Sequence, residues 1–354
     1  MHLFRWLLAP LAPLYGTAVR LRNRAFDQHP GRSASVPAPV VSVGNLSTGG
    51  TGKTPVALHL VEALAAAGRR AAIVSRGYGG RRALDPMAVE PGSDPAQTGD
   101  EPLMMARRLG PGRVVVGRKR HAAALRALAL EPPPDLLILD DGFQHRALRR
   151  DLDLLVLDGV RRWGNGRMLP LGDLREAMAS AARASCLVVT RAARADREAI
   201  LAWWRRWGSD GPVFWLDFSI GALRRFGTGE RMELPAPPPG SLFAFCALGH
   251  PEAFYADLLV AGLPWVGTLS LRDHQALAPR QLRRLEAEAR SAGAAGLVCT
   301  EKDAVKLDAG TTLSLPLWVA EQRVTGGQAL TDWLLRRLGW SAVPPAPAGA
   351  PPPG

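Results

Sequence analysis

Residues 39–67 read PVVSVGNLSTGGTGKTPVALHLVEALAAA, and this stretch decides the fold. Its first six residues form a short apolar run that predicts a buried strand. The glycine-rich segment that follows lets backbone N–H groups curl around a phosphate. Helix-period apolar residues from Pro55 to Ala67 predict a helix, whose N-terminus adds positive potential. Strand, loop and helix in this order predict a phosphate-binding P-loop.

We expect every residue of this loop to bind nucleotide: Ser47, Thr48, Gly49, Gly50, Thr51, Gly52, Lys53 and Thr54. Lys53 would reach the β- and γ-phosphates, and the Thr54 hydroxyl would ligate Mg²⁺. The strict pattern G-x-x-x-x-G-K-[ST] requires glycine at position 47, where this chain has Ser47. We expect Gly49 and Gly50 to supply the flexibility instead.

Short apolar runs alternate with helical patterns from residue 39 to residue 191. This alternation predicts an α/β fold, with a parallel P-loop sheet and helices on both of its faces. The predicted strands are residues 39–44, 71–77, 114–117, 136–141, 152–158 and 186–191. A second set of apolar runs predicts a second, smaller α/β domain, with strands at 213–218, 242–249, 295–303 and 315–321 and helices at 251–261 and 279–292.

We therefore expect four segments along the 354 residues. They are an N-terminal membrane-associating helix at 1–24, a P-loop core domain at 25–212, a C-terminal α/β domain at 213–335 and a disordered Pro-rich tail at 336–354. The Pro-rich segment LPAPPPG at 234–240 indicates a linker region near the boundary. The tail is rich in proline, alanine and glycine, so it cannot bury enough apolar surface to fold.

The formal net charge of +12 favours acidic partners such as nucleotides, anionic lipid or nucleic acid. Nucleic acid is disfavoured, because aromatic residues make up only 6% and no recognised binding motif is present. Only four of the 44 basic residues are lysines, which draws attention to Lys53, although arginine-biased codon usage is an alternative explanation. The three cysteines lie in separate apolar runs and predict buried thiols, not a zinc site.

The N-terminus reads MHLFRWLLAPLAPLYGTAVRLRNR. Its apolar stretch from Trp6 to Val19 is too short to span a bilayer and contains two prolines. Arginines follow the apolar stretch, whereas a signal peptide carries its charges ahead of it. An interfacial helix fits this pattern. The alternative is a helix that packs on the core of the protein.

The apolar run LLILDD ends in Asp140 and Asp141. A strand-terminal aspartate beside a P-loop is the expected second anchor of the metal ion. Adjacent residues of a strand point to opposite faces, so we expect one carboxylate to contact the ion or its water and the other to be structural. A solvated strand end is the alternative.

Seven segments together resemble the tetraacyldisaccharide 4′-kinase family of lipid A biosynthesis. In order, they are GNLSTGGTGKTP (44–55), SRGYGG (75–80), GDEP (99–102), LDDGFQH (139–145), NGRMLPLGDLRE (165–176), LRDHQ (271–275) and TEKDAVKL (300–307). They cover roughly residues 1–330, and Ser47 fits the family pattern. The Pro-rich tail is not explained by the resemblance.

The resemblance implies that ATP donates its γ-phosphoryl group to the 4′-hydroxyl of a tetraacyl disaccharide 1-phosphate, yielding lipid IVA. It implies a peripheral enzyme at the cytoplasmic face of the inner membrane, with ATP and Mg²⁺ as cofactors. Carried over by motif, Asp100 would be the general base and His274 would orient it. From the residues alone there is an alternative for each. Asp100 would be the N-cap of the helix that follows it, and His274 would be an exposed histidine in a loop.

The same motifs suggest residues that contact the acceptor or its phosphate groups: Arg76, Tyr78, Arg120, Gln144, His145, Asn165, Arg167 and Glu176. For each of these, a structural salt bridge or turn is the alternative. Two other functions keep the P-loop but need neither GDEP nor LRDHQ. One is an ATPase with water as the acceptor, and the other is a nucleotide-switched membrane-binding module. The sequence identifies no protein partner.

Overall fold

The strand predicted ahead of the P-loop is β1, and it lies inside an eight-stranded sheet whose order is β3-β4-β2-β5-β1-β6-β7-β8. The computed structural model describes residues 10–78, 80, 85–236, 240–248, 251–272, 278–307 and 310–341. All neighbouring strands of this sheet are parallel except β3 and β4. The strands are β1 (Val40–Gly44), β2 (Ala71–Ser75), β3 (Met87–Ala88), β4 (Val114–Val116), β5 (Leu136–Asp140), β6 (Leu152–Asp158), β7 (Cys186–Thr190) and β8 (Val213–Trp215).

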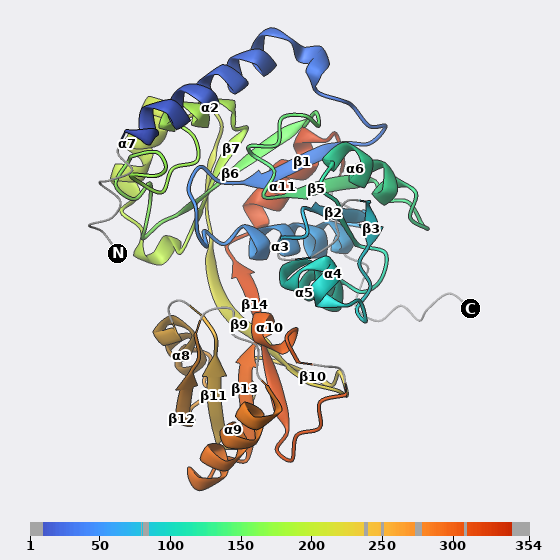
Figure 1. Cartoon of the computed structure of the whole chain (residues 1–354), viewed down its shortest axis with the longest axis vertical. Coiled ribbons are helices and arrows are strands. Elements are labelled where there is room, and N and C mark those ends of the chain that lie inside the picture. The colour runs from blue at the N-terminus through green and yellow to red at the C-terminus, as the bar shows by residue number, and fades with distance from the viewer. Residues whose placement is uncertain are drawn as a thin grey trace.

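Helices cover both faces of this sheet, as predicted (Figure 1). Successive side chains of each strand point to opposite faces. Val41 and Val43 therefore pack with α3, α5 and α11, whereas Val40 packs with α6 on the other face. The helices are α3 (Lys53–Ala66), α4 (Pro95–Thr98), α5 (Asp100–Leu109), α6 (Arg120–Leu128), α7 (Arg197–Trp207) and α11 (Gln328–Arg337), with short 3₁₀ turns η1 (Pro30–Arg32), η2 (Met178–Arg183) and η3 (Ala192–Arg194).

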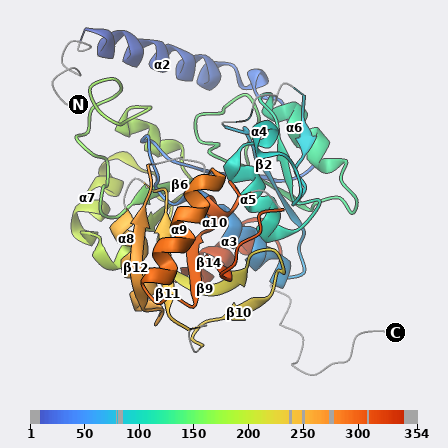
Figure 2. The same ribbon diagram turned by 60° about the horizontal axis from the view of Figure 1, so that its bottom comes forward.

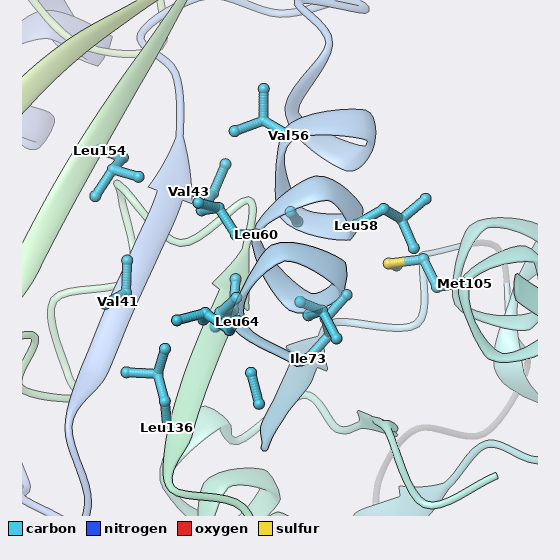
Figure 3. Packing of buried hydrophobic residues seen from close by; sticks show 14 of the residues in the cluster. Val41, Val43, Val56, Leu58, Leu60, Leu64, Ile73, Met105, Leu136 and Leu154 are labelled. Atoms are coloured by element: carbon cyan, nitrogen blue, oxygen red, sulfur yellow. The ribbon is translucent and has the colours of Figure 1, made fainter. Parts of the chain in front are cut away.

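Helix α3 follows the P-loop and is held against the sheet by a stripe of apolar residues. Val56, Leu60 and Leu64 recur every four residues, so they share one face of the helix. All three are fully buried, and Figure 3 shows them gathered beside the residues of β1. Burying each such side chain contributes about 1.5–3 kcal/mol. The start of α3, which forms part of the phosphate site, is therefore fixed rigidly on the sheet.

A six-stranded sheet of order β10-β9-β14-β13-β11-β12 forms the second lobe. Strands β11 to β14 run parallel, and β9 is antiparallel to both β14 and β10. The elements are β9 (Asp217–Arg225), β10 (Arg231–Glu233), β11 (Leu242–Cys246), β12 (Trp265–Ser270), β13 (Gly296–Thr300), β14 (Leu317–Thr325), α8 (Pro251–Val260), α9 (Pro279–Ser291) and α10 (Glu301–Ala304). Figure 1 shows β9 and β14 running together from this lobe into the first.

The boundary predicted at residue 213 does not match the membership of the sheets. The predicted strand 213–218 is divided, because β8 is the edge strand of the first sheet and β9 begins the second. Helix α11 also returns to the first lobe, where Leu330 and Leu334 are fully buried in the core around α3. The Pro-rich segment 234–240 stands in the sequence between β10 and β11, which belong to the same sheet, and its residues 237–239 lie outside the described chain.

The predicted tail starts too early. Residues 336 and 337 still belong to α11, and Trp340 packs against the core of the first lobe. Residues 342–354 lie outside the described part of the chain.

The N-terminal helix α2 (Leu11–Gln28) lies on the first lobe, on the side away from the second (Figures 1 and 2). Leu11, Leu14 and Leu21 are 50%, 67% and 59% exposed, whereas Gly16 is buried. Of the helices that the structure describes, none is long and apolar enough to cross a bilayer. Residues 1–9 of the predicted interfacial segment lie outside the described chain.

Candidate functional site

The P-loop connects β1 to α3, and each of its bends has an identifiable cause. Gly49 and Gly52 have φ angles of 98° and 84°, which side chains other than glycine rarely adopt. Thr51 is buried, where its hydroxyl accepts a hydrogen bond from Asn45 (3.0 Å) and its carbonyl accepts one from Thr190 (2.9 Å). The Thr48 N–H donates to the Asp173 carbonyl (2.7 Å). These hydrogen bonds fix the backbone of the loop against the neighbouring segments of the chain.

The second lobe reaches this loop through β9. A Cβ atom built on Gly52 would lie 2.5 Å from the Phe218 ring, so the loop accepts only glycine at this position. Phe218 belongs to the strand that runs between the lobes, and its ring packs with the core around α3. The phosphate cradle therefore lies where the two lobes meet.

Asp140 ends β5 and is almost fully buried beside the P-loop, because β5 pairs directly with β1. Its Oδ2 accepts a hydrogen bond from the Ser75 hydroxyl (3.1 Å), and its Oδ1 has no hydrogen-bond partner among the described residues. Burial raises the pKa of Asp140 to about 6, and the negative charges of Glu101 and Asp141 add to the effect. This carboxylate therefore needs a positive partner at neutral pH.

Asp141 faces the cationic groups of the site. It has a positive φ of 51°, and its carboxylate lies 3.6 Å from Lys53 Nζ and 2.7 Å from Arg175 Nη1. Burial alone would raise the pKa of Asp141, but Lys53 and Arg175 lower it below its usual value. The two aspartates thus differ in their partners: Asp141 is held in ion pairs with Lys53 and Arg175, and Asp140 accepts a hydrogen bond from Ser75. Oδ1 of each has no hydrogen-bond partner among the described residues, and which carboxylate contacts an ion stays a prediction.

These groups fit a magnesium ion. Mg²⁺ prefers oxygen ligands and keeps several waters and phosphate oxygens, so the protein needs to supply only one or two groups. The unpartnered oxygen of Asp140 and the Thr54 hydroxyl, in the first turn of α3, are such groups. Among the described residues, no three His, Cys, Asp or Glu side chains gather into a metal cluster. One carboxylate and one hydroxyl are donors of the kind that hold a Mg²⁺ ion together with the phosphates of a nucleotide.

Three of the residues predicted to bind the acceptor, Arg76, Arg120 and His145, interact electrostatically with one another. Arg120 also interacts with both aspartates. Arg120 is buried and donates to the Gly117 carbonyl (2.8 Å). Burial lowers the pKa of Arg120 to about 10 against the opposing effect of Asp140, and Arg76 lowers it further. Burial, Arg120 and other arginines including Arg76 lower the pKa of His145 to about 4, so His145 is neutral at physiological pH. Arg76 is exposed and Arg120 is buried, so positive charge lies both on and below the surface near the aspartates.

The other predicted acceptor residues divide into exposed and structural ones. Tyr78 is 83% exposed on the loop after β2. The Gln144 side-chain amide donates to the Asn45 carbonyl (2.9 Å) and so braces the start of the P-loop segment. Asn165 bridges its own loop, because it donates to the Leu171 carbonyl (3.1 Å) and accepts from the Arg167 N–H (3.1 Å).

Glu176 holds α2 in place. Its side chain is fully buried, accepts a hydrogen bond from Asn23 of α2 (2.7 Å) and pairs with Arg183 (3.0 Å). Burial alone would raise the pKa of Glu176, but Arg183 and Asn23 keep it lowered. In contrast to the predicted substrate contact, the geometry gives Glu176 a structural position beneath the N-terminal helix.

Asp100 is the first residue of α5, and the cap of that helix is Gly99 instead. Asp100 is therefore not the N-cap itself, but it lies in the first turn of the helix, where an acidic side chain also has a structural role. Glu101 follows it and acts electrostatically on Asp140, so the start of α5 lies near the P-loop edge. His274 lies outside the described residues, and its role as the partner of Asp100 stays a prediction.

Ser75, Glu101 and Arg175 interact with the two aspartates but were not among the predicted site residues. All three lie inside the motifs SRGYGG, GDEP and NGRMLPLGDLRE. The motifs therefore contained the signal, but spacing along the chain does not show which member of a motif points inward.

A P-loop at the centre of a parallel sheet, with strand-end aspartates beside it, defines a P-loop nucleotide-binding enzyme. A family model described as tetraacyldisaccharide-1-P 4′-kinase matches residues 4–339. The chain therefore belongs to the tetraacyldisaccharide 4′-kinase family and is a kinase. The family resemblance is confirmed, and the alternatives of an ATPase or a nucleotide-switched binding module give way to it.

Named relatives agree over nearly the whole chain. The tetraacyldisaccharide 4′-kinase of Chromobacterium violaceum is 39% identical over 343 residues, which cover 94% of each chain. That of Dinoroseobacter shibae is 41% identical over 334 residues, which cover 92% of each chain. A crystal structure of LpxK from Aquifex aeolicus in complex with ATP matches with a TM-score of 0.75 and 29% identity, covering 94% of this chain and 99% of the other. This match confirms the predicted fold class.

Proposed function

We propose that this chain transfers the γ-phosphoryl group of ATP to the 4′-hydroxyl of a tetraacyl disaccharide 1-phosphate at a membrane surface, yielding lipid IVA. One observation carries the proposal. A P-loop lysine, an ion-paired aspartate and a buried aspartate oxygen without a partner lie together at one sheet edge. The kinase family of the chain supplies the reaction and the class of acceptor.

The nucleotide would lie in the cradle of residues 47–54, with its phosphates on the loop N–H groups and on Lys53. Asp140 and Thr54 would hold Mg²⁺, which neutralises charge on the β- and γ-phosphates when it is bound. Asp141 lies 3.6 Å from Lys53 and 2.7 Å from Arg175, and so keeps both cations aimed at the same edge. These residues bind and orient the donor.

Asp100 is our candidate for the general base. In the proposed step the 4′-oxygen of the sugar forms a bond to the γ-phosphorus, and the bond from that phosphorus to the β–γ bridging oxygen breaks. ADP leaves with the electron pair of the broken bond, and the hydroxyl proton passes to the Asp100 carboxylate. Asp100 begins α5, and its neighbour Glu101 interacts electrostatically with Asp140, which supports this assignment.

The acceptor would approach the strand edge at Arg76, which is exposed, while the buried Arg120 adds positive charge to the same edge. A phosphorylated disaccharide carries the negative charge that this edge suits. The acyl chains would stay in the membrane. Helix α2 would lie on the membrane through its exposed leucines and its basic residues Arg20, Arg22 and Arg24. Because ATP is cytoplasmic, we propose the cytoplasmic face of the inner membrane as the place of the reaction.

The test is a transfer assay with γ-labelled ATP, Mg²⁺ and a detergent-dispersed tetraacyl disaccharide 1-phosphate. We expect a labelled lipid, and we expect chelation of Mg²⁺ to abolish the label. A disaccharide whose 4′-hydroxyl is blocked is the matched control and should stay unlabelled. If the folded protein labels the blocked lipid equally well, the acceptor atom is wrong; if neither lipid is labelled, the proposed function fails.

A further inference from the structure

The loop that follows β6 brings an arginine onto the P-loop. A Cβ atom built on Gly49 would lie 2.9 Å from Nη1 of Arg161, with two further guanidinium atoms at 3.6 Å. The guanidinium therefore rests directly against the backbone of Gly49. The absence of a side chain at this position is what allows the contact.

The backbone of this loop is fixed by Asp158, the last residue of β6. Its Oδ1 accepts hydrogen bonds from the N–H groups of Val160 (2.9 Å) and Arg161 (3.0 Å). The other oxygen of Asp158 pairs with Arg191. Because Asp158 is buried, this arrangement ties the base of the Arg161 side chain to the sheet. Arg161 is thus held at its backbone, while its charged end lies over the phosphate cradle.

Arg161 forms a longer and more exposed ion pair than the arginines Arg175 and Arg191 do. Arg175 is 2.7 Å from Asp141, and Arg191 pairs with the buried Asp158. The guanidinium of Arg161 is 3.9 Å from the Asp173 carboxylate, and its side chain is 52% exposed. A weak and exposed ion pair costs little to exchange for a better anion. Arg161 can therefore turn from Asp173 to a phosphate at small cost.

Gly49 is the third of eight residues in the cradle, whose seventh residue is Lys53. The loop and its lysine enclose the β- and γ-phosphates between them. The Arg161 guanidinium lies against Gly49 and therefore against the same cradle. Arginine presents a planar fork that fits two phosphate oxygens, and an arginine supplied in this way stabilises the charge that develops during phosphoryl transfer.

We propose that Arg161 is a further catalytic residue, which contacts the γ-phosphate of bound ATP and stabilises it during transfer. The inference rests on the proposed function, since it assigns the space over Gly49 to the phosphates of ATP. It adds to that function an arginine supplied by the chain itself. Arg161 is thus distinct from Arg175, which is anchored on Asp141.

The test compares Arg161→Ala and Arg161→Lys with Arg162→Ala. Arg162 is the matched control, because it is the next residue but pairs with Asp196 on the surface and lies over Trp163. We expect Arg161→Ala to lower kcat about 10²- to 10³-fold, as for other groups that stabilise transition-state charge. We expect Arg161→Lys to restore little of this loss, because a lysine lacks the planar fork. Arg162→Ala should stay within about twofold of the wild type.

Binding measurements complete the test, with thermal unfolding to confirm that each variant is folded. We expect Arg161→Ala to weaken binding of ATP more than binding of ADP, because only ATP carries the γ-phosphate. An unchanged kcat in folded Arg161→Ala would overturn the proposal, as would a loss confined to KM for the lipid. If the wild type transferred nothing to the lipid, the proposed function would fail, but the comparison of ATP with ADP would still test Arg161.

Discussion

Arg108 ties the two lobes together through one guanidinium group. It donates to Glu62 of α3 (2.7 Å), to Glu301 of α10 (3.1 Å) and to the Gln322 carbonyl of β14 (2.6 Å). Gln322 lies at a register shift of β14, where that strand passes between the lobes. Arg108 also lies on α5, the helix that begins with Asp100. Replacing Arg108 with methionine therefore tests how the lobes are joined.

The expected loss of stability follows from the burial of each partner. The side chains of Arg108 and Glu301 are only 11% and 10% exposed, and breaking a buried pair costs about 3–5 kcal/mol because the remaining charge is stranded. Since some exposure remains, we expect Arg108→Met to lower the free energy of unfolding by about 3 kcal/mol. Glu62 is 43% exposed, so we expect Glu62→Gln to cost about 0.5 kcal/mol.

The assay is equilibrium unfolding in urea at several pH values, with Glu62→Gln as the control. Burial raises the pKa of Glu301 above its ordinary value of 4.5, although Arg108 opposes this. Without Arg108 the pKa of Glu301 rises further, so the folded variant binds a proton that the unfolded chain does not. The loss of stability should then be smallest below about pH 4.5 and grow as the pH rises.

Adding Glu301→Gln to Arg108→Met removes the stranded charge but keeps an acceptor for the Gln322 N–H, which donates to Glu301 at 3.2 Å. We expect the double variant to recover at least half of the lost stability. The buried ion pair would not be what joins the lobes if Arg108→Met and Glu62→Gln lowered the free energy of unfolding equally. The same conclusion would follow if the loss for Arg108→Met did not change with pH.

Three further outcomes are expected. Asp100→Asn should lower kcat by about 10²- to 10⁴-fold while the Kd for ATP, measured by calorimetry, stays within about twofold; normal turnover would exclude Asp100 as the base. Gly52→Ala should weaken ATP binding and lower the Tm, because its Cβ would lie 2.5 Å from an aromatic ring at a φ of 84°. The control Gly92→Ala, at an exposed glycine outside the loop whose Cβ would meet no atom within 4 Å, should be tolerated. Leu14→Glu should reduce cosedimentation with anionic vesicles about tenfold, and an equal effect of the control Leu125→Glu on α6 would argue against docking through α2.

Local patterns predicted the P-loop and the strand end that carries Asp140 and Asp141. The P-loop is encoded in one continuous segment, and Asp140 follows an apolar run that could only be a buried strand. The placement of Asp140 beside the loop follows from parallel strands whose carboxyl ends share one edge. These features depend on neighbours in sequence and on the general rules of parallel sheets.

Long-range pairing was not predictable in the same way. The run VFWLDF contains no glycine or proline, so nothing local shows that its first half pairs with β7 and its second half with β14. Glu176 ends a motif of the family, and its full burial becomes visible only when α2 is placed on it. Arg161 contacts Gly49, although it lies more than a hundred residues after Gly49 in the sequence. Such contacts arise from tertiary packing, which sequence spacing does not encode.

The N-terminal helix and the phosphate site share one short support. The Tyr15 hydroxyl of α2 donates to the Arg175 carbonyl (3.0 Å), and Asn23 of the same helix donates to Glu176 (2.7 Å). The Arg175 side chain in turn holds Asp141, which pairs with the P-loop lysine. Because two adjacent residues serve both purposes, α2 cannot shift on the first lobe without moving the anchor of that aspartate. The helix that we propose to dock on a membrane therefore also supports the aspartate beside the P-loop.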